Sequence, residues 1–122
     1  MIQPHKKTYI LLIEDDDAVS FLLAIQLKEA GFKCRQVFTV SQAKVVLESP
    51  LSKVDLVITD YTLPDGTAKD ILPLCTCKNI PVIGISGEDE NEQWFLENGA
   101  SGFLAKPFEV KKLLPFLINF MV

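Results

Sequence analysis

The hydrophobic residues of this chain fall into two kinds of block. Short continuous apolar runs, as at residues 9–13 and 81–85, are typical of strands that a parallel sheet buries on both faces. Longer segments, such as 16–30, carry apolar residues at helical spacing, and Gly31 is a plausible stop for that helix. The two kinds alternate along the chain.

This alternation predicts an α/β fold with a doubly wound parallel sheet, because crossover connections between parallel strands are right-handed. Ser41 is expected to cap the second helix. In such folds ligands bind beyond the carboxyl ends of the strands. The predicted strands are 9–13, 34–38, 54–59, 81–85 and 102–105, and the predicted helices are 16–30, 41–48, 69–77, 88–98 and 109–122.

Residues with reactive or charged side chains follow four of the predicted strands. Glu14 and Asp15 follow the first strand, Asp60 the third, Ser86 the fourth and Lys106 the fifth. Carboxylates that approach within ~4–6 Å repel one another unless a cation or a lysine lies between them. Hard oxygen ligands suit Mg²⁺ better than zinc or copper. We therefore expect a magnesium site at this edge of the sheet.

Taken singly, the charged residues at the strand ends also have simpler explanations. The acidic run after the first strand continues with Asp16 and Asp17, which are better explained as charges that complement the dipole of the following helix. Asp60 alone fits a turn cap, and Lys106 alone fits a solvated surface lysine. Their coincidence at separate strand ends favours a phosphoryl site, in which Asp60 is the nucleophile, Lys106 neutralises charge and Ser86 donates a hydrogen bond.

With these residues at its strand ends, the chain resembles the receiver domain of two-component response regulators. The matching segments are 10–16, 55–66, 81–87 and 99–108, which occur in the family's order and at similar spacing. The resemblance covers nearly all of the chain, so residues 1–122 are expected to form one receiver domain. It implies a flavodoxin-like (βα)5 fold, whose parallel sheet has the strand order 2-1-3-4-5.

The resemblance also implies roles for individual residues. Asp15 would bind Mg²⁺ directly and Glu14 through water. Asp60 would be both the phosphoacceptor and a metal ligand, and Thr62 would offer its backbone carbonyl to the metal. Lys106 would pair with the phosphoryl group.

Further residues match the family's switch and tuning positions. Ser86 and Phe103 would form the switch pair, and the side chains of Thr62 and Glu88 would tune dephosphorylation. The implied function is that of a phosphoacceptor in a two-component phosphorelay. It would take its phosphoryl group from a sensor histidine kinase or a phosphotransfer protein. An output domain or a downstream protein would then read the face made by the fourth helix, fifth strand and fifth helix.

Such a module is not an enzyme for other substrates, since it catalyses only its own phosphorylation and slow dephosphorylation. Three alternatives remain beside it. A pseudo-receiver would be an interaction module on the same fold without phosphorylation control. An aspartyl-phosphate hydrolase would favour a second Asp where this chain has Thr62, and a flavin module would face an acidic rim that repels its phosphate.

The chain departs from the family pattern at several positions. Ala68 replaces a usual glycine, and Pro73 and Pro115 fall inside predicted helices, where proline removes a donor. Pro73 is tolerated if its helix begins near Asp70, whereas Pro115 is expected to kink the last helix. The segment 86–106 is slightly short, which predicts a short or reoriented fourth helix.

Composition adds limits. The net charge of -4 argues against direct nucleic-acid binding, and no apolar run reaches the ~18 residues that span a membrane. Cys34, Cys75 and Cys77 lack a disulfide or zinc spacing, so a cytoplasmic protein with reduced thiols is expected. The last predicted helix is apolar nearly all round, which favours a homodimer or packing on a neighbouring domain.

Overall fold

A five-stranded parallel sheet forms the centre of the molecule. A computed structural model describes residues 8–88, 90–106 and 110–117. The strands lie in the order β2-β1-β3-β6-β7 with every neighbouring pair parallel, which confirms the doubly wound sheet and the predicted order 2-1-3-4-5. Their bounds are β1 Tyr9–Ile13, β2 Lys33–Val37, β3 Leu56–Asp60, β6 Val82–Ser86 and β7 Gly102–Ala105.

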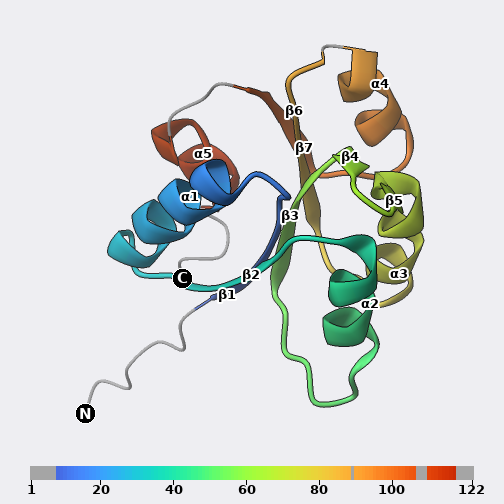
Figure 1. The fold of residues 1–122 in the computed structure, drawn as a ribbon, viewed down its shortest axis with the longest axis horizontal. Coiled ribbons are helices and arrows are strands. Elements are labelled where there is room, and N and C mark those ends of the chain that lie inside the picture. The colour runs from blue at the N-terminus through green and yellow to red at the C-terminus, as the bar shows by residue number, and fades with distance from the viewer. Residues whose placement is uncertain (1–7, 89, 107–109, 118–122) are drawn as a thin grey trace.

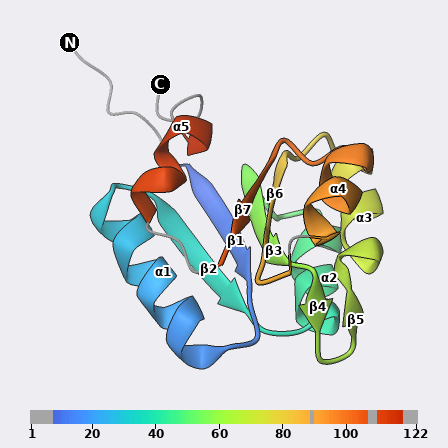
Figure 2. The ribbon, with the colours of Figure 1, turned by 90° about the horizontal axis from the view of Figure 1, so that it is seen from above.

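Helices cover both faces of this sheet (Figure 1). The view from above places α1 and α5 on one face, and α2, α3 and α4 on the other (Figure 2). A small hairpin of β4 (Thr62–Leu63) and β5 (Gly66–Thr67) follows β3. The helices are α1 Asp17–Glu29, α2 Val40–Glu48, α3 Leu72–Cys77, α4 Glu90–Glu97 and α5 Leu114–Leu117. None of the helices in the described ranges is both long and apolar enough to cross a bilayer.

The sheet separates two apolar layers, and neighbouring residues of β1 enter opposite layers. Ile10 and Leu12 pack in the layer under α1 and α5, whereas Leu11 and Ile13 pack in the layer under α2, α3 and α4. All four side chains are fully buried. Burial on both faces explains why β1 reads as a continuous apolar run rather than an alternating one.

The acidic residues after Glu14 and Asp15 serve helix α1, as predicted. Asp16 is the N-cap, and its carboxylate accepts a hydrogen bond of 3.0 Å from the Val19 N–H. Asp17 lies in the first turn, where its charge complements the helix dipole. Helix α1 ends at Glu29, before Gly31 at φ 101°, a backbone conformation that favours glycine.

The predicted cap of α2 is wrong. Thr39 is the N-cap, since its hydroxyl accepts from the Gln42 N–H at 3.1 Å. Ser41 is the second residue of α2 and donates its N–H and its hydroxyl to Asp65, at 3.0 and 2.9 Å. The Val40 N–H donates to the same carboxylate at 2.7 Å. Asp65, from the turn between β4 and β5, therefore ties that turn to the start of α2.

Of the expected departures from the family pattern, the late start of α3 and the short α4 are confirmed, whereas the kinked last helix is not. Helix α3 begins late, after a 3₁₀ turn at Ala68–Asp70, so that Pro73 stands in its first turn, where its missing N–H costs little. Helix α4 is short, as the short segment predicted. The predicted continuous last helix is wrong, because a 3₁₀ turn at Val110–Lys112 precedes α5. Pro115 thus lies in the first turn of α5 rather than at a kink, and residues 107–109 and 118–122 of that prediction lie outside the described residues.

Helix α4 approaches the sheet closely over Gly84. A Cβ atom added at Gly84 would lie 2.5 Å from the ring of Phe95, which is fully buried. The absence of a side chain at this position therefore makes room for the largest buried side chain of α4. The same test at Gly87 meets nothing within 4 Å.

We predict that Gly84→Ala lowers the free energy of unfolding by about 1–3 kcal/mol, because overpacking forces the Phe95 ring or the strand to move. Urea unfolding measures this change. Gly87→Ala is the matched control and should leave the midpoint nearly unchanged. Equal midpoints for the two variants would contradict the close packing of α4 on β6.

We also predict that Asp65→Asn removes an acid-sensitive part of the stability. The N–H groups of Val40 and Ser41 hold the pKa of Asp65 below its ordinary value of 3.8. A lowered pKa stabilises the fold above that value, and the effect is lost as the pH falls through the folded-state pKa. Urea unfolding curves of the variant and the wild type should therefore differ at neutral pH and converge in acid. Ser41→Ala keeps both N–H donors, so its stability should still fall in acid as that of the wild type does. If Asp65→Asn differed from the wild type by the same free energy of unfolding at every pH, this role of Asp65 would be contradicted.

Candidate functional site

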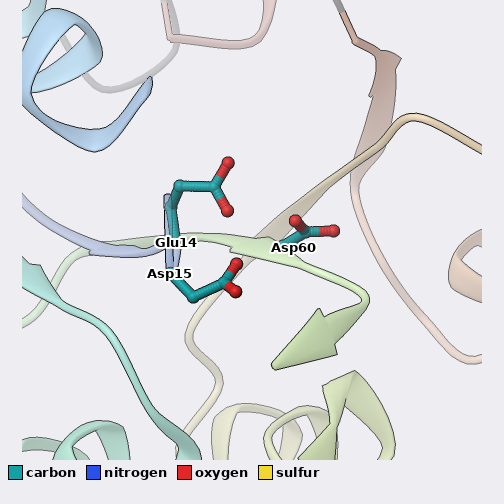
Figure 3. Close-up of side chains that lie close together, drawn as sticks. All are labelled: Glu14, Asp15 and Asp60. Atoms are coloured by element: carbon teal, nitrogen blue, oxygen red, sulfur yellow. The ribbon is translucent and has the colours of Figure 1, made fainter. Parts of the chain in front are cut away.

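Three carboxylates meet at the carboxyl edge of the sheet. Glu14 and Asp15 follow β1, and Asp60 ends β3, the neighbouring strand. One oxygen from each lies within 4.8 Å of the others. Figure 3 shows the carboxylates of Glu14 and Asp15 directed toward the side of Asp60. The predicted convergence of these residues is what the structure shows.

Backbone hydrogen bonds fix the two ends of this site. The Glu14 N–H donates to the Val37 carbonyl at 3.1 Å, which extends the β1–β2 ladder by one residue. The Lys106 N–H donates to the Ser86 carbonyl at 2.8 Å, just after β7. Glu14 and Lys106 are thus held in place although each lies one residue past its strand.

Lys106 joins two of the three carboxylates. Its Nζ lies 2.7 Å from Asp60 Oδ2 and also donates to Glu14 Oε1. Burial alone would lower the pKa of Lys106, but the hydrogen bonds and charges of Asp60 and Glu14 outweigh burial and raise it. Lys106 is therefore a fixed positive charge at neutral pH.

Glu14 is the most confined group of the site. Its side chain is fully buried, and burial is the main reason that its pKa is raised to about 7, with Lys106 opposing the shift and Asp60 adding to it. Its Oε2 is the one buried side-chain oxygen without a hydrogen bond in the described part of the chain. A buried carboxylate oxygen without a donor, beside two further carboxylates, fits a hard divalent cation such as Mg²⁺.

Asp60 is anchored through both oxygens and remains accessible. Oδ1 accepts the N–H of Tyr61 at 2.7 Å, while Oδ2 accepts from Lys106. Its side chain is 14% exposed, and Asp15 beside it is exposed. A partly exposed carboxylate in a fixed orientation can serve as a nucleophile.

The hydroxyl of Ser86 lies at the end of β6, next to β3. Its Oγ accepts two hydrogen bonds, from the Asn91 Nδ2 at 2.8 Å and the Glu88 N–H at 3.1 Å. Helix α4 begins at Glu90, later than the predicted residue 88. Asn91 was not predicted as a site residue, although a polar residue one turn before Phe95 on the buried side of α4 is a detectable signal.

Phe103 lies in an aromatic cluster, which we define as Tyr61, Trp94, Phe95 and Phe103. The rings of Phe95 and Phe103 are 5.7 Å apart, and that of Tyr61 is 5.2 Å from Trp94 and 6.0 Å from Phe95. Phe103 is only 9% exposed, so its ring points inward. Phe95 belongs to the core, whereas Trp94 is half-buried. The cluster connects Asp60, through its neighbour Tyr61, with α4 and β7.

The other predicted site residues lie near the same edge. Thr62 begins β4 two residues after Asp60, with its side chain exposed, and Glu88 is exposed after β6. Their predicted effects on metal binding and dephosphorylation stay predictions. The three cysteines are free thiols, as expected.

A groove between α3 and α4, with a volume of about 580 Å³, lies away from these carboxylates. Its lining contains no acidic residue, so it does not offer the chemistry of the carboxylate site. The lining residues are Lys69, Leu72, Pro73, Thr76, Cys77, Trp94 and Asn98.

Comparison with known proteins assigns the chain to a family. The family model of the response regulator receiver domain matches residues 10–117. The chain belongs to this family. Receiver domains are signalling modules of two-component systems, and the acidic edge with its lysine is where the family resemblance placed the phosphoryl site.

Curated relatives of this receiver domain come from plants and bacteria. It is 34% identical over 116 residues to the two-component response regulator-like protein APRR3 of Arabidopsis thaliana. The alignment covers 90% of this chain and 23% of APRR3. It is 38% identical over 109 residues to the swarming motility regulation protein RssB of Serratia marcescens, covering 86% of this chain and 49% of RssB. The chain thus spans about a quarter to a half of these relatives.

Solved structures agree on the fold. The non-phosphorylated HemR receiver domain from Leptospira biflexa superposes with a TM-score of 0.79 at 28% identity, covering 93% of each chain. A two-component response regulator from Clostridium difficile gives a TM-score of 0.83 at 22% identity, covering 95% of this chain and 100% of the other. The second likeness concerns the fold alone.

We predict that Mg²⁺ changes the fluorescence of Trp94, which is the single tryptophan of the chain. Its ring contacts Tyr61, the neighbour of Asp60, so a cation bound to the carboxylates should alter its surroundings. Asp15→Asn should weaken the Mg²⁺ affinity at least about tenfold, since losing one of three close charges removes more than ~1.4 kcal/mol. Asp17→Asn, two residues away on α1, is the control and should titrate like the wild type. Equal affinities for both variants would exclude Asp15 as a ligand.

Proposed function

We propose that this receiver domain accepts a phosphoryl group on Asp60 in a Mg²⁺-dependent reaction. The observation that carries the proposal is the pairing of Asp60 Oδ2 with Lys106 Nζ at 2.7 Å beside the carboxylates of Glu14 and Asp15. The single ammonium of Lys106 does not balance three carboxylates. Once a divalent metal ion joins it, the site has enough positive charge to bind a phosphoryl dianion.

The donor is the phosphohistidine of a sensor histidine kinase or a phosphotransfer protein. An oxygen of the Asp60 carboxylate forms a bond to phosphorus while the phosphorus–nitrogen bond breaks, and the imidazole nitrogen leaves with the electron pair and takes up a proton. Lys106 offsets the charge of the phosphoryl oxygens. Ser86 donates its hydroxyl proton to one of these oxygens.

Glu14, Asp15 and Asp60, with the backbone carbonyl of Thr62, would hold the metal. When bound, Mg²⁺ would neutralise the negative charge shared by the carboxylates and the phosphoryl group. The fully buried Glu14 would complete the shell through water, and the exposed Asp15 would contact the ion directly.

Phosphorylation would act on the face made by α4, β7 and α5. The negative phosphoryl oxygens would attract the hydroxyl of Ser86 and the ammonium of Lys106, which lie at the ends of β6 and β7. Since Phe103 already lies inward, phosphorylation is proposed to stabilise this position within an equilibrium rather than to create it. Thr62 and Glu88, which are both exposed, would tune the access of the attacking water.

The face would be read by an output domain or a downstream protein. A homodimer through the last helix remains part of the proposal. Within the described residues Leu113 and Leu117 are buried on the sheet, and Phe116 is half-buried. The residues that gave the last helix its surplus of apolar side chains, 118–122, lie outside the described residues.

The decisive test is covalent labelling of the full chain with acetyl phosphate and Mg²⁺, followed by intact mass measurement. Wild-type protein should gain one phosphoryl group that hydroxylamine removes, and Asp60→Asn should gain none, because an amide does not attack phosphorus. Lys106→Ala should label more slowly, and Asp17→Asn should label normally. Labelling of Asp60→Asn at the wild-type rate would refute the acceptor assignment, and an inert wild type would favour the pseudo-receiver alternative.

A further inference from the structure

The hydroxyl of Ser86 is held by two donors in a buried setting. Ser86 is 3% exposed, and Asn91, whose amide donates to it at 2.8 Å, is 8% exposed. The second donor is the backbone N–H of Glu88, at 3.1 Å. Both donors come from the loop and the first turn of α4, so one serine hydroxyl joins the end of β6 to this helix.

The geometry restricts what this hydroxyl can do. A serine oxygen has two lone pairs and one proton. When Asn91 and Glu88 fill the two lone pairs, the proton must point in a third direction, and the hydroxyl can only act as a donor. A phosphoryl oxygen is an acceptor, so a hydroxyl fixed in this manner is prepared for it.

We propose that Asn91 is a positioning residue for phosphoryl transfer: its amide, with the Glu88 N–H, orients the Ser86 hydroxyl as a donor to the incoming phosphoryl group. This inference rests on the proposed function of Asp60. It assigns to α4 a part in the reaction itself, in addition to its place on the output face.

The packing of α4 explains why Asn91 can hold this place. The Asn91 N–H donates to the Glu88 carbonyl at 3.1 Å, which sets the first turn. One turn later Phe95 lies on the same side of the helix and packs over Gly84, two residues before Ser86. Because Gly84 allows this close approach, the amide of Asn91 reaches the end of β6.

Loss of the Asn91 amide should change the rate of Asp60 labelling in a specific way. Removing one neutral hydrogen bond is expected to slow labelling of Asp60 about fivefold. The effect must disappear when Ser86 is absent, because Asn91 acts only through its hydroxyl. A residue that merely supports the fold would slow the reaction whether or not Ser86 is present.

The test is a double-mutant cycle on the rate of labelling by acetyl phosphate with Mg²⁺, using the full chain. The variants are Asn91→Ala, Ser86→Ala and the two combined. Gln93→Ala is the control, since Gln93 is exposed on the same helix and donates its side-chain amide to Glu97, away from Ser86. We expect Asn91→Ala to be about fivefold slower than wild type. The double variant should match Ser86→Ala, and Gln93→Ala should match wild type.

Asn91→Asp provides a second measurement that keeps the shape of the side chain. A carboxylate can only accept, so it should draw the Ser86 proton toward itself and slow labelling more than Asn91→Ala does. The same substitution in the Ser86→Ala protein measures the effect of the added charge alone, which is then divided out. Circular dichroism establishes that each compared variant is folded.

The outcomes separate this inference from the proposed function. A wild type that takes no label refutes both. A labelled wild type with Asn91→Ala at or above its rate, or slowed by the same factor with and without Ser86, refutes the positioning role and leaves the acceptor assignment of Asp60 intact. A slow Asn91→Ala whose defect vanishes in the Ser86→Ala protein supports it.

Discussion

Repulsion among carboxylates at one edge of the sheet is the constraint on which the rest of this structure depends. Glu14, Asp15 and Asp60 would not remain together as three bare charges, and the single ammonium of Lys106 offsets only part of their charge. Because Glu14 is buried, the uncompensated negative charge is least favourable there, where one oxygen lacks a donor in the described part of the chain. The fold therefore holds the carboxylates in an arrangement that a cation and a phosphoryl group would stabilise.

The apolar layers are what make such an arrangement tolerable. Strands β1 and β3 are buried on both faces, so their ends are fixed by many contacts that do not involve the charged residues. Backbone bonds from Glu14 to Val37 and from Lys106 to Ser86 continue the sheet by one residue into the site. The energy that keeps like charges adjacent thus comes from hydrophobic burial elsewhere in the molecule.

Sequence patterns predicted the parallel sheet and the convergence of Glu14, Asp15, Asp60 and Lys106, because strand ends and charged residues are local signals. The strand order followed from the family resemblance and not from the pattern. The patterns failed where a distant residue decided the local structure. Thr39 rather than Ser41 caps α2, since Asp65, far along the chain, engages Ser41. Asn91 was missed for another reason: its role depends on the hydroxyl of Ser86, five residues earlier, and helical periodicity alone does not reveal that contact.

The close approach of α4 at Gly84 has a consequence for how related sequences can vary. The space above β6 is filled by the ring of Phe95, so the two positions share one fixed volume. A relative with a larger residue at the position of Gly84 should carry a smaller one at the position of Phe95, and single exchanges at either position should be rare. The pair is thus expected to covary across the family, and an alignment of receiver domains would make that covariation visible.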